Sequence, residues 1–113
     1  MSKSTFYALK INKFKTVYGF YKEEGSLIVI KNMKFGVYQT WITKEMQKRK
    51  IWYVVELESG ISIGSAETKT GAIIAARRNI DNIHPTLFVN KITEAIKRYG
   101  RSPLYQEGMN LDA

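Results

Sequence analysis

Three carboxylates and one lysine come closest to a catalytic pattern in this sequence. Glu67-Thr68-Lys69 follows Glu56 and Glu58 along the chain, and metal-dependent nucleases place an acid on one strand and an acid-x-lysine on the next. Such carboxylates must surround one cation at oxygen-to-metal distances of roughly 2 Å. In the hairpin expected here, Glu67 lies opposite Ile51, and Glu56 is five residues farther along the strand, about 16 Å away. The sequence therefore predicts a solvated hairpin edge at this place, not a nuclease centre.

Other residue types that support catalysis are sparse. His84 is the single histidine and stands just before Pro85, where a helix must end, and no motif supplies a nucleophile or an orienting partner for it. The chain has no cysteine, which excludes thiolate zinc sites, disulfides and cysteine nucleophiles. Gly60, Gly64 and Gly71 match neither a dinucleotide-binding nor a phosphate-loop spacing. We expect no catalytic residue, no metal and no cofactor.

Charge is the most unusual property of the composition. The 113 residues include 18 lysines and arginines against 10 acids, a formal net charge of +8, with a pI of about 9.7. The whole excess lies in residues 1–50, whereas residues 51–113 are neutral, and 11 of the 14 aromatic residues also precede residue 54. Such a field attracts anionic partners, namely nucleic acid, an acidic membrane surface or an acidic protein.

Basic side chains in three places are candidate contacts for such a partner. Lysines and aromatic residues interleave in residues 6–22, where strands can present rings to bases and ammonium groups to phosphates. The densest cluster is 48–50, and Arg77-Arg78 forms another. The alternative is a solvated face, because strand aromatics are normally core and edge lysines oppose aggregation. The candidate binding residues are Lys10, Lys13, Lys15, Lys48, Arg49, Lys50, Arg77 and Arg78.

The elements that position these side chains begin with strands. Residues 6–14 alternate, 16–22 are β-branched and aromatic, and 27–31 form an apolar run after the turn-like Glu23-Glu24-Gly25-Ser26. A loop at 32–34 precedes a further strand over 35–42. Residues 43–50 are polar and are expected to form a connecting loop or one helical turn. Together these segments predict an antiparallel meander.

Residues 51–57 and 61–66 predict a hairpin. They flank Glu58-Ser59-Gly60, a three-residue loop of the kind that ends with glycine in the left-handed conformation. This loop length sets Val55 opposite Ile63 and Tyr53 opposite Ser65. The pairing gathers apolar residues on one face of the hairpin, whereas a two-residue loop would mix them with glutamates. The residues of that face are Ile51, Tyr53, Val55, Leu57, Ile61 and Ile63.

Two helices follow the hairpin. Thr68 or Thr70 can cap the first, and His84-Pro85 ends it. The second carries an apolar stripe beginning at Phe88 and ends at Gly100. The sequence therefore predicts an α+β fold, with an antiparallel sheet of five or six strands followed by two C-terminal helices packed on one face. Residues 1–105 are expected to form a single domain and residues 106–113 a short C-terminal tail.

One short segment resembles parts of two known families. It reads Gly64-Ser65-Ala66-Glu67-Thr68-Lys69-Thr70-Gly71-Ala72 and is followed by Ala75-Ala76. It is similar to the strand-to-helix junction of double-stranded RNA-binding domains and to the hairpin and helix that end the arm-binding domains of phage integrases. The RNA-binding family opens with a helix, where this sequence predicts strands, and its paired lysines are here reduced to Lys69. We assign the chain to neither family.

The sequence as a whole predicts a small, basic, non-enzymatic binding protein that engages nucleic acid or a nucleoprotein complex through its N-terminal half. In style it also resembles accessory proteins of phages and mobile elements. The alternative is therefore an inhibitor of a host-defence effector, similar to anti-CRISPR proteins, that binds an acidic protein surface directly. The N-terminus lacks the apolar stretch of a signal peptide, and the apolar runs are too short to span a bilayer. We expect a cytoplasmic protein without a membrane partner, and the sequence leaves its oligomeric state open.

Overall fold

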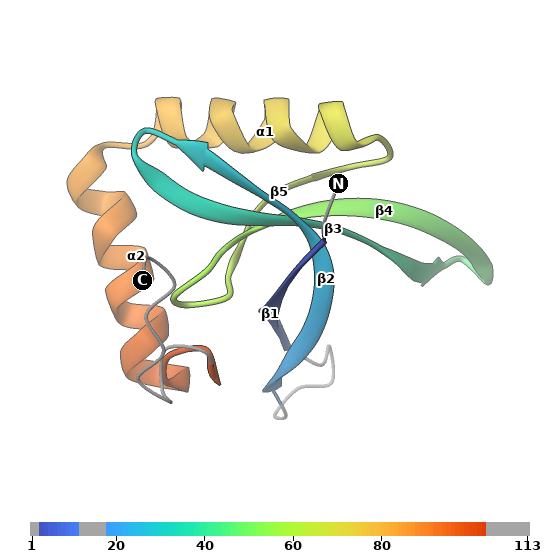
Figure 1. Ribbon diagram of the computed structural model, residues 1–113, viewed down its shortest axis with the longest axis horizontal. Coiled ribbons are helices and arrows are strands. Elements are labelled where there is room, and N and C mark those ends of the chain that lie inside the picture. Colours follow the sequence, from blue (N-terminus) through green and yellow to red (C-terminus); the bar gives the residue numbers. More distant parts are fainter. Residues whose placement is uncertain (1–2, 12–17, 104–113) are drawn as a thin grey trace.

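The computed structural model describes residues 3–11 and 18–103, which form an antiparallel sheet followed by two helices (Figure 1). The strands are hydrogen-bonded in chain order. They are β1 (Ser4–Ile11), β2 (Tyr18–Ile30), β3 (Met33–Lys44), β4 (Gln47–Glu56) and β5 (Ser62–Ala66). The helices are α1 (Lys69–Asn82) and α2 (Pro85–Tyr99). The α+β class, the meander and the helix order predicted from the sequence are confirmed.

β2 is one continuous strand where the sequence predicts two strands and a turn. Its first half pairs with β1 as far as Gly25, and its second half pairs with β3 from Ser26 onward. Residues 23–26 therefore mark the point at which the strand changes partner. A Cβ atom on Gly25 would overlap the backbone of Val37 on β3, so only glycine permits this close approach.

Two hairpins have two-residue turns with positive φ at both positions. These turns are Lys31–Asn32, with φ of 50° and 66°, and Glu45–Met46, with φ of 52° and 65°. Turns of this conformation match the twist of the flanking strands. The prediction of a loop or helical turn over 43–50 is wrong, because the polar residues there extend β3 and β4. Where both faces of a pair of strands are exposed to solvent, apolar and polar residues need not alternate, so the sequence lacks the pattern that identifies a strand.

The β4–β5 hairpin keeps the predicted pairing of Tyr53 with Ser65, and its loop ends at Gly60 with φ of 78°. A β-bulge between residues 54 and 55 shifts the register nearer the loop. As a result, Ile63 packs against the helix-side core, whereas Val55 belongs to the cluster on the other face. The prediction that Ile63 shares one apolar face of the hairpin with Val55 is therefore wrong.

Apolar side chains form two clusters on opposite faces of the sheet. The helix-side cluster includes residues of both helices, which confirms that both pack on one face. α1 lies across β5 and β4, and α2 stands beside the end of α1 at a steep angle to it (Figure 1). The buried members of this cluster are Ile30, Phe35, Val37, Val54, Ala72, Ala76, Ile80 and Phe88.

β1 crosses the opposite face and covers the second cluster. The Phe6 ring lies where a side chain at Gly36 would otherwise stand, and the backbone N–H of Leu9 donates to the Gly60 carbonyl at 2.8 Å. These contacts curl the sheet so that its first strand reaches the β4–β5 loop. The buried members of the second cluster are Phe6, Ala8, Tyr38, Val55 and Leu57.

Both helices have side-chain caps at their N-termini. The Thr68 hydroxyl accepts a hydrogen bond from the Gly71 N–H at 3.0 Å, and His84 Nδ1 accepts one from the Thr86 N–H at 3.1 Å. Each contact satisfies a backbone donor that the helix itself leaves free. The single histidine is thus a helix cap, and Gly100, with φ of 86°, ends α2.

Candidate nucleic-acid interface

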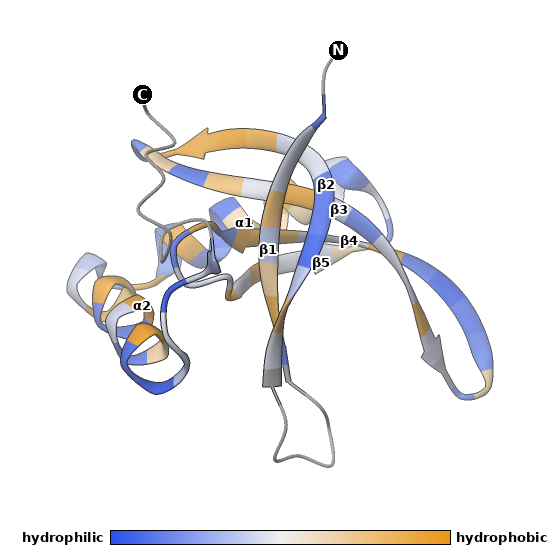
Figure 2. Ribbon diagram, turned by 60° about the horizontal axis from the view of Figure 1, so that its bottom comes forward, coloured by the Kyte–Doolittle hydropathy of each residue, from blue (hydrophilic) through white to orange (hydrophobic). Residues whose placement is uncertain are grey.

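The outer part of the β3–β4 hairpin, residues 39–51, is a two-stranded ribbon that extends beyond the body of the sheet (Figure 1). Pairing of β3 with β2 ends at Val37, and pairing of β4 with β5 ends at Trp52. Residues 45–50 are all exposed. In Figure 2 the outer part of β4 is coloured as hydrophilic. We call residues 39–51 the ribbon.

Lysine and tryptophan side chains share one face of the ribbon. Trp41 pairs with Lys50, whose ammonium group lies 5.1 Å from the centroid of the indole ring. Strand alternation places Lys48 and Trp52 on this same face, and the Lys69 ammonium group lies 5.9 Å from the Trp52 ring centroid. We call these five residues the Trp–Lys strip.

The strip lies on the helix side of the sheet. Trp52 packs against the helix-side core, and Lys69 is the first residue of α1 and donates to the Ser26 hydroxyl at 3.2 Å. From this point the strip follows the ribbon outward to Lys48. Trp41 remains 59% exposed, so an indole ring and ammonium groups are presented together to solvent. This combination can contact bases or sugars with the ring and phosphates with the lysines.

Two of the sequence-predicted binding residues lie elsewhere and are held in ion pairs. Arg49 projects from the opposite face of the ribbon, and its guanidinium group is 2.7 Å from a Glu67 carboxylate oxygen. Lys10 lies against the second apolar cluster, with its ammonium group 2.7 Å from Glu23 and 5.5 Å from the Tyr38 ring centroid. The structure therefore separates both residues from Lys48 and Lys50.

The remaining predicted residues do not join the strip. Arg77 and Arg78 are exposed on α1, whereas the buried residues of that helix, among them Ala76, face the sheet. Lys13 and Lys15 lie outside the described residues. Of the eight predicted residues, the structure brings together Lys48 and Lys50.

Sequence reasoning missed Trp41, Trp52 and Lys69 as members of this surface. Their proximity depends on the two-residue turn at Glu45–Met46, which sets Trp41 opposite Lys50. That dipeptide is not typical of such turns, for which Asn-Gly and Asp-Gly are strongly preferred. The signal that would have revealed the strip is therefore absent from the sequence.

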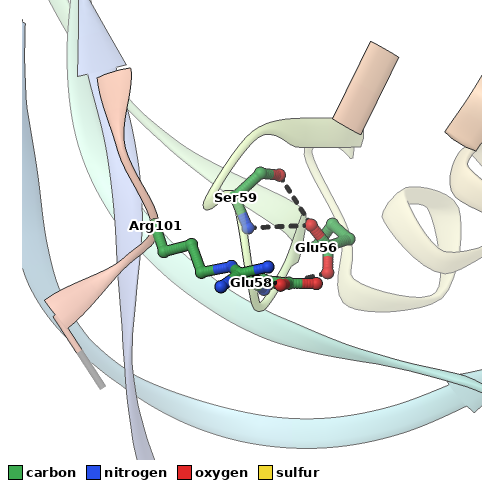
Figure 3. Close-up of polar contacts among 4 residues, drawn as sticks. All are labelled: Glu56, Glu58, Ser59 and Arg101. Atoms are coloured by element: carbon green, nitrogen blue, oxygen red, sulfur yellow. Dashed lines mark hydrogen bonds and ion pairs between the residues drawn. The ribbon is translucent and has the colours of Figure 1, made fainter. Parts of the chain in front are cut away.

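The carboxylates considered above for metal chemistry have structural contacts (Figure 3). Glu56 is buried, and its carboxylate accepts hydrogen bonds from the Ser59 hydroxyl at 2.6 Å, the Ser59 N–H at 2.8 Å and the Glu58 N–H at 2.9 Å. Glu58 in turn forms a 2.7 Å ion pair with Arg101. The described part of the chain contains no group of three or more histidine, cysteine or acidic residues that could hold a metal ion. These contacts fix the β4–β5 loop.

Comparison with protein-family models, with curated protein sequences and with solved structures gave no significant match. Of the two helices described, neither is long and apolar enough to cross a membrane. The geometry and charge of the ribbon are thus the basis for proposing a function.

Proposed function

We propose that this protein is a small, non-enzymatic nucleic-acid-binding protein that contacts its partner through the ribbon, with the Trp–Lys strip at the centre. The observation that carries this proposal is the combination of Lys48 and Lys50 with the exposed Trp41 on one face of a protruding β-ribbon. Among the described residues, no carboxylate forms an ion pair with Lys48 or Lys50. Their charge is available to an external anion.

The shape of the ribbon supports the same function. Two-stranded β-ribbons are among the elements that enter the grooves of nucleic acids. Lysine contacts to phosphates supply affinity without reading sequence. The strip contains no arginine, asparagine or glutamine, whose planar groups read guanine or adenine through two parallel hydrogen bonds, and its lysines are flexible point charges suited to phosphates. The proposal is therefore a binder with little sequence preference.

A charge-reversal variant tests this function. We expect Lys48→Glu combined with Lys50→Glu to weaken binding to short nucleic acids at least tenfold at low salt, because attraction to phosphates becomes repulsion. The matched control is Lys22→Glu with Lys91→Glu, which changes the net charge equally at exposed positions outside the ribbon. Fluorescence anisotropy with single- and double-stranded DNA and RNA gives the affinities. Absence of binding to all four, or equal affinity of the two double variants, would contradict the proposal.

An acidic protein is the second candidate partner. Aromatic and methionine side chains are enriched at protein interfaces, and Trp41 and Met46 are both exposed on the ribbon. The protein would then be a phage or mobile-element accessory protein that inhibits a host-defence effector. A pull-down with and without nuclease treatment separates the two candidates. A nuclease-resistant partner lost in the Lys48/Lys50 variant, together with no nucleic-acid binding at low salt, would favour the protein partner.

A further inference from the structure

The turn at the end of the ribbon has a sequence that does not suit its conformation. Both two-residue turns place two non-glycine residues at positive φ, a region that favours glycine, asparagine and aspartate. The β2–β3 turn contains Asn32, and its Lys31 is held in a 2.9 Å ion pair with Asp81. The β3–β4 turn is Glu45–Met46, and neither residue type favours left-handed backbone. Such strain commonly marks a functional position.

Met46 is also the most solvent-exposed large apolar side chain described, at 97%. It stands at the apex of the ribbon, two residues from Lys48. An apolar side chain in this place makes no contribution to either core, so folding does not explain it. Its neighbour Glu45 is repelled by phosphates, so of the two turn residues Met46 is the one suited to contact a nucleic acid.

We propose that Met46 is a wedge that inserts between two base pairs of duplex DNA from the minor groove and kinks the duplex. This inference rests on the proposed function. Methionine is one of the apolar residues that unstack a base step in this way and bend DNA by about 20–90°. Lys48 and Lys50 then hold the flanking phosphates while the tip reaches the bases.

The dimensions of the ribbon favour a bent duplex. Neighbouring strands are about 4.8 Å apart before their side chains are added, and the undeformed minor groove is about 6 Å wide. The ribbon therefore needs a widened groove, and a wedge that bends the duplex toward the major groove provides one. Flexible TA and CA/TG steps deform most readily, so we expect insertion there.

Single strands and duplex RNA fit the ribbon less well. Binding to single strands normally uses several aromatic side chains on which successive bases stack. On this ribbon Trp41 is the widely exposed ring, and Lys50 already lies over it. Duplex RNA has a shallow, wide minor groove, so the groove would not enclose the turn at the end of the ribbon.

End-labelled duplex DNA with a central TA step tests the wedge by fluorescence energy transfer. We expect the wild-type protein to increase the transfer efficiency. Measured at a protein concentration that saturates the duplex, Met46→Asn should lose this increase in transfer, because the phosphate contacts of the lysines remain while the wedge is absent. Asparagine suits the left-handed turn, so the variant should unfold at a temperature no lower than wild type. The matched control is Leu87→Asn, at an apolar residue that is 56% exposed on α2, and it should bend DNA as wild type does.

Failure of the wedge and failure of nucleic-acid binding give different results. If the wild-type protein binds duplex DNA without any change in transfer, or if Met46→Asn bends it fully, the wedge is wrong and the binding function stands. Equal or tighter binding to duplex RNA would also overturn the inference. If the wild-type protein binds no nucleic acid at low salt, the proposed function fails and the wedge fails with it.

Discussion

At the scale of single residues, Tyr38 shows how the fold controls one ionisable group. Its ring stacks on Tyr53 with centroids 5.5 Å apart and lies 6.1 Å from the Phe6 ring. Burial raises the pKa of Tyr38 far above its usual value near 10, and the Glu23 carboxylate and Tyr53 add to the shift. The folded protein therefore keeps this hydroxyl protonated in alkali, whereas the unfolded chain releases the proton near pH 10.

This raised pKa predicts a loss of stability in alkali. Below pH 10 the folded and unfolded states both hold the proton, so Tyr38 adds no pH dependence there. As pH rises above 10, the free energy of unfolding should fall by up to about 1.4 kcal/mol per pH unit from this group. Tyr38→Phe removes that contribution, so its stability should depend less on pH. Urea unfolding of both proteins between pH 8 and about pH 11 measures the difference, and parallel curves would show that Tyr38 ionises normally in the folded state.

The choice of lysines at the ribbon was possible from the sequence because Lys48 and Lys50 belong to its densest basic cluster. The sequence did not predict that Arg49 lies on the opposite face from these lysines. That placement depends on strand alternation, and the segment was expected to be a loop or a helical turn. The Glu67 ion pair that holds Arg49 depends on the register of a different hairpin. Individual charges were thus visible in the sequence, but their partners were not.

At the scale of elements, the strands with a buried face were predictable. Alternation and β-branched or aromatic composition indicated most of β1, β3, β4 and β5. The two helices followed from apolar spacing, from the alternative caps Thr68 and Thr70 and from the helix end at His84-Pro85. The continuity of β2 was missed because Gly25 is typical of a turn, although its role is to let β2 approach β3. A glycine in a sequence is compatible with a turn of the chain or with a close approach of two strands, and only the tertiary contact distinguishes the two.

A pair of glycine substitutions tests this account of β2. Gly25→Ala places a methyl group against the β3 backbone at Val37, and we expect it to lower the free energy of unfolding by about 2–3 kcal/mol. Gly19→Ala is the control on the same strand, because its Cβ would lie at an ordinary 3.6 Å from the Tyr21 ring. Chemical denaturation followed by tryptophan fluorescence gives both values. Equal stabilities would mean that β2 does not depend on this close approach.

At the scale of the whole molecule, the charge excess of the N-terminal half is partly neutralised by the fold. Ion pairs join the two halves of the chain at Lys31–Asp81 and Arg49–Glu67, and Lys10 is paired with Glu23 within the first half. The acids of the neutral half thus neutralise some of the excess, whereas Lys48 and Lys50 on the ribbon form no ion pair with any carboxylate that the structure describes. The net charge of +8 is therefore larger than the positive charge that is available to an external anion. The fold determines which of the basic side chains remain available.

The salt dependence of binding tests whether this selected surface is the one used. Each phosphate contact contributes about −0.9 to the slope of log K against log salt for duplex DNA, so Lys48→Ala with Lys50→Ala should make the slope shallower by roughly 1.8. Arg77→Ala with Arg78→Ala removes the same charge from α1. Helical geometry turns Arg78 about 200° from the buried Ala76, so this arginine points away from the sheet and from the helix-side face of the ribbon. We therefore expect the arginine variant to keep the wild-type slope, and an equal reduction in both variants would extend the contact surface over α1.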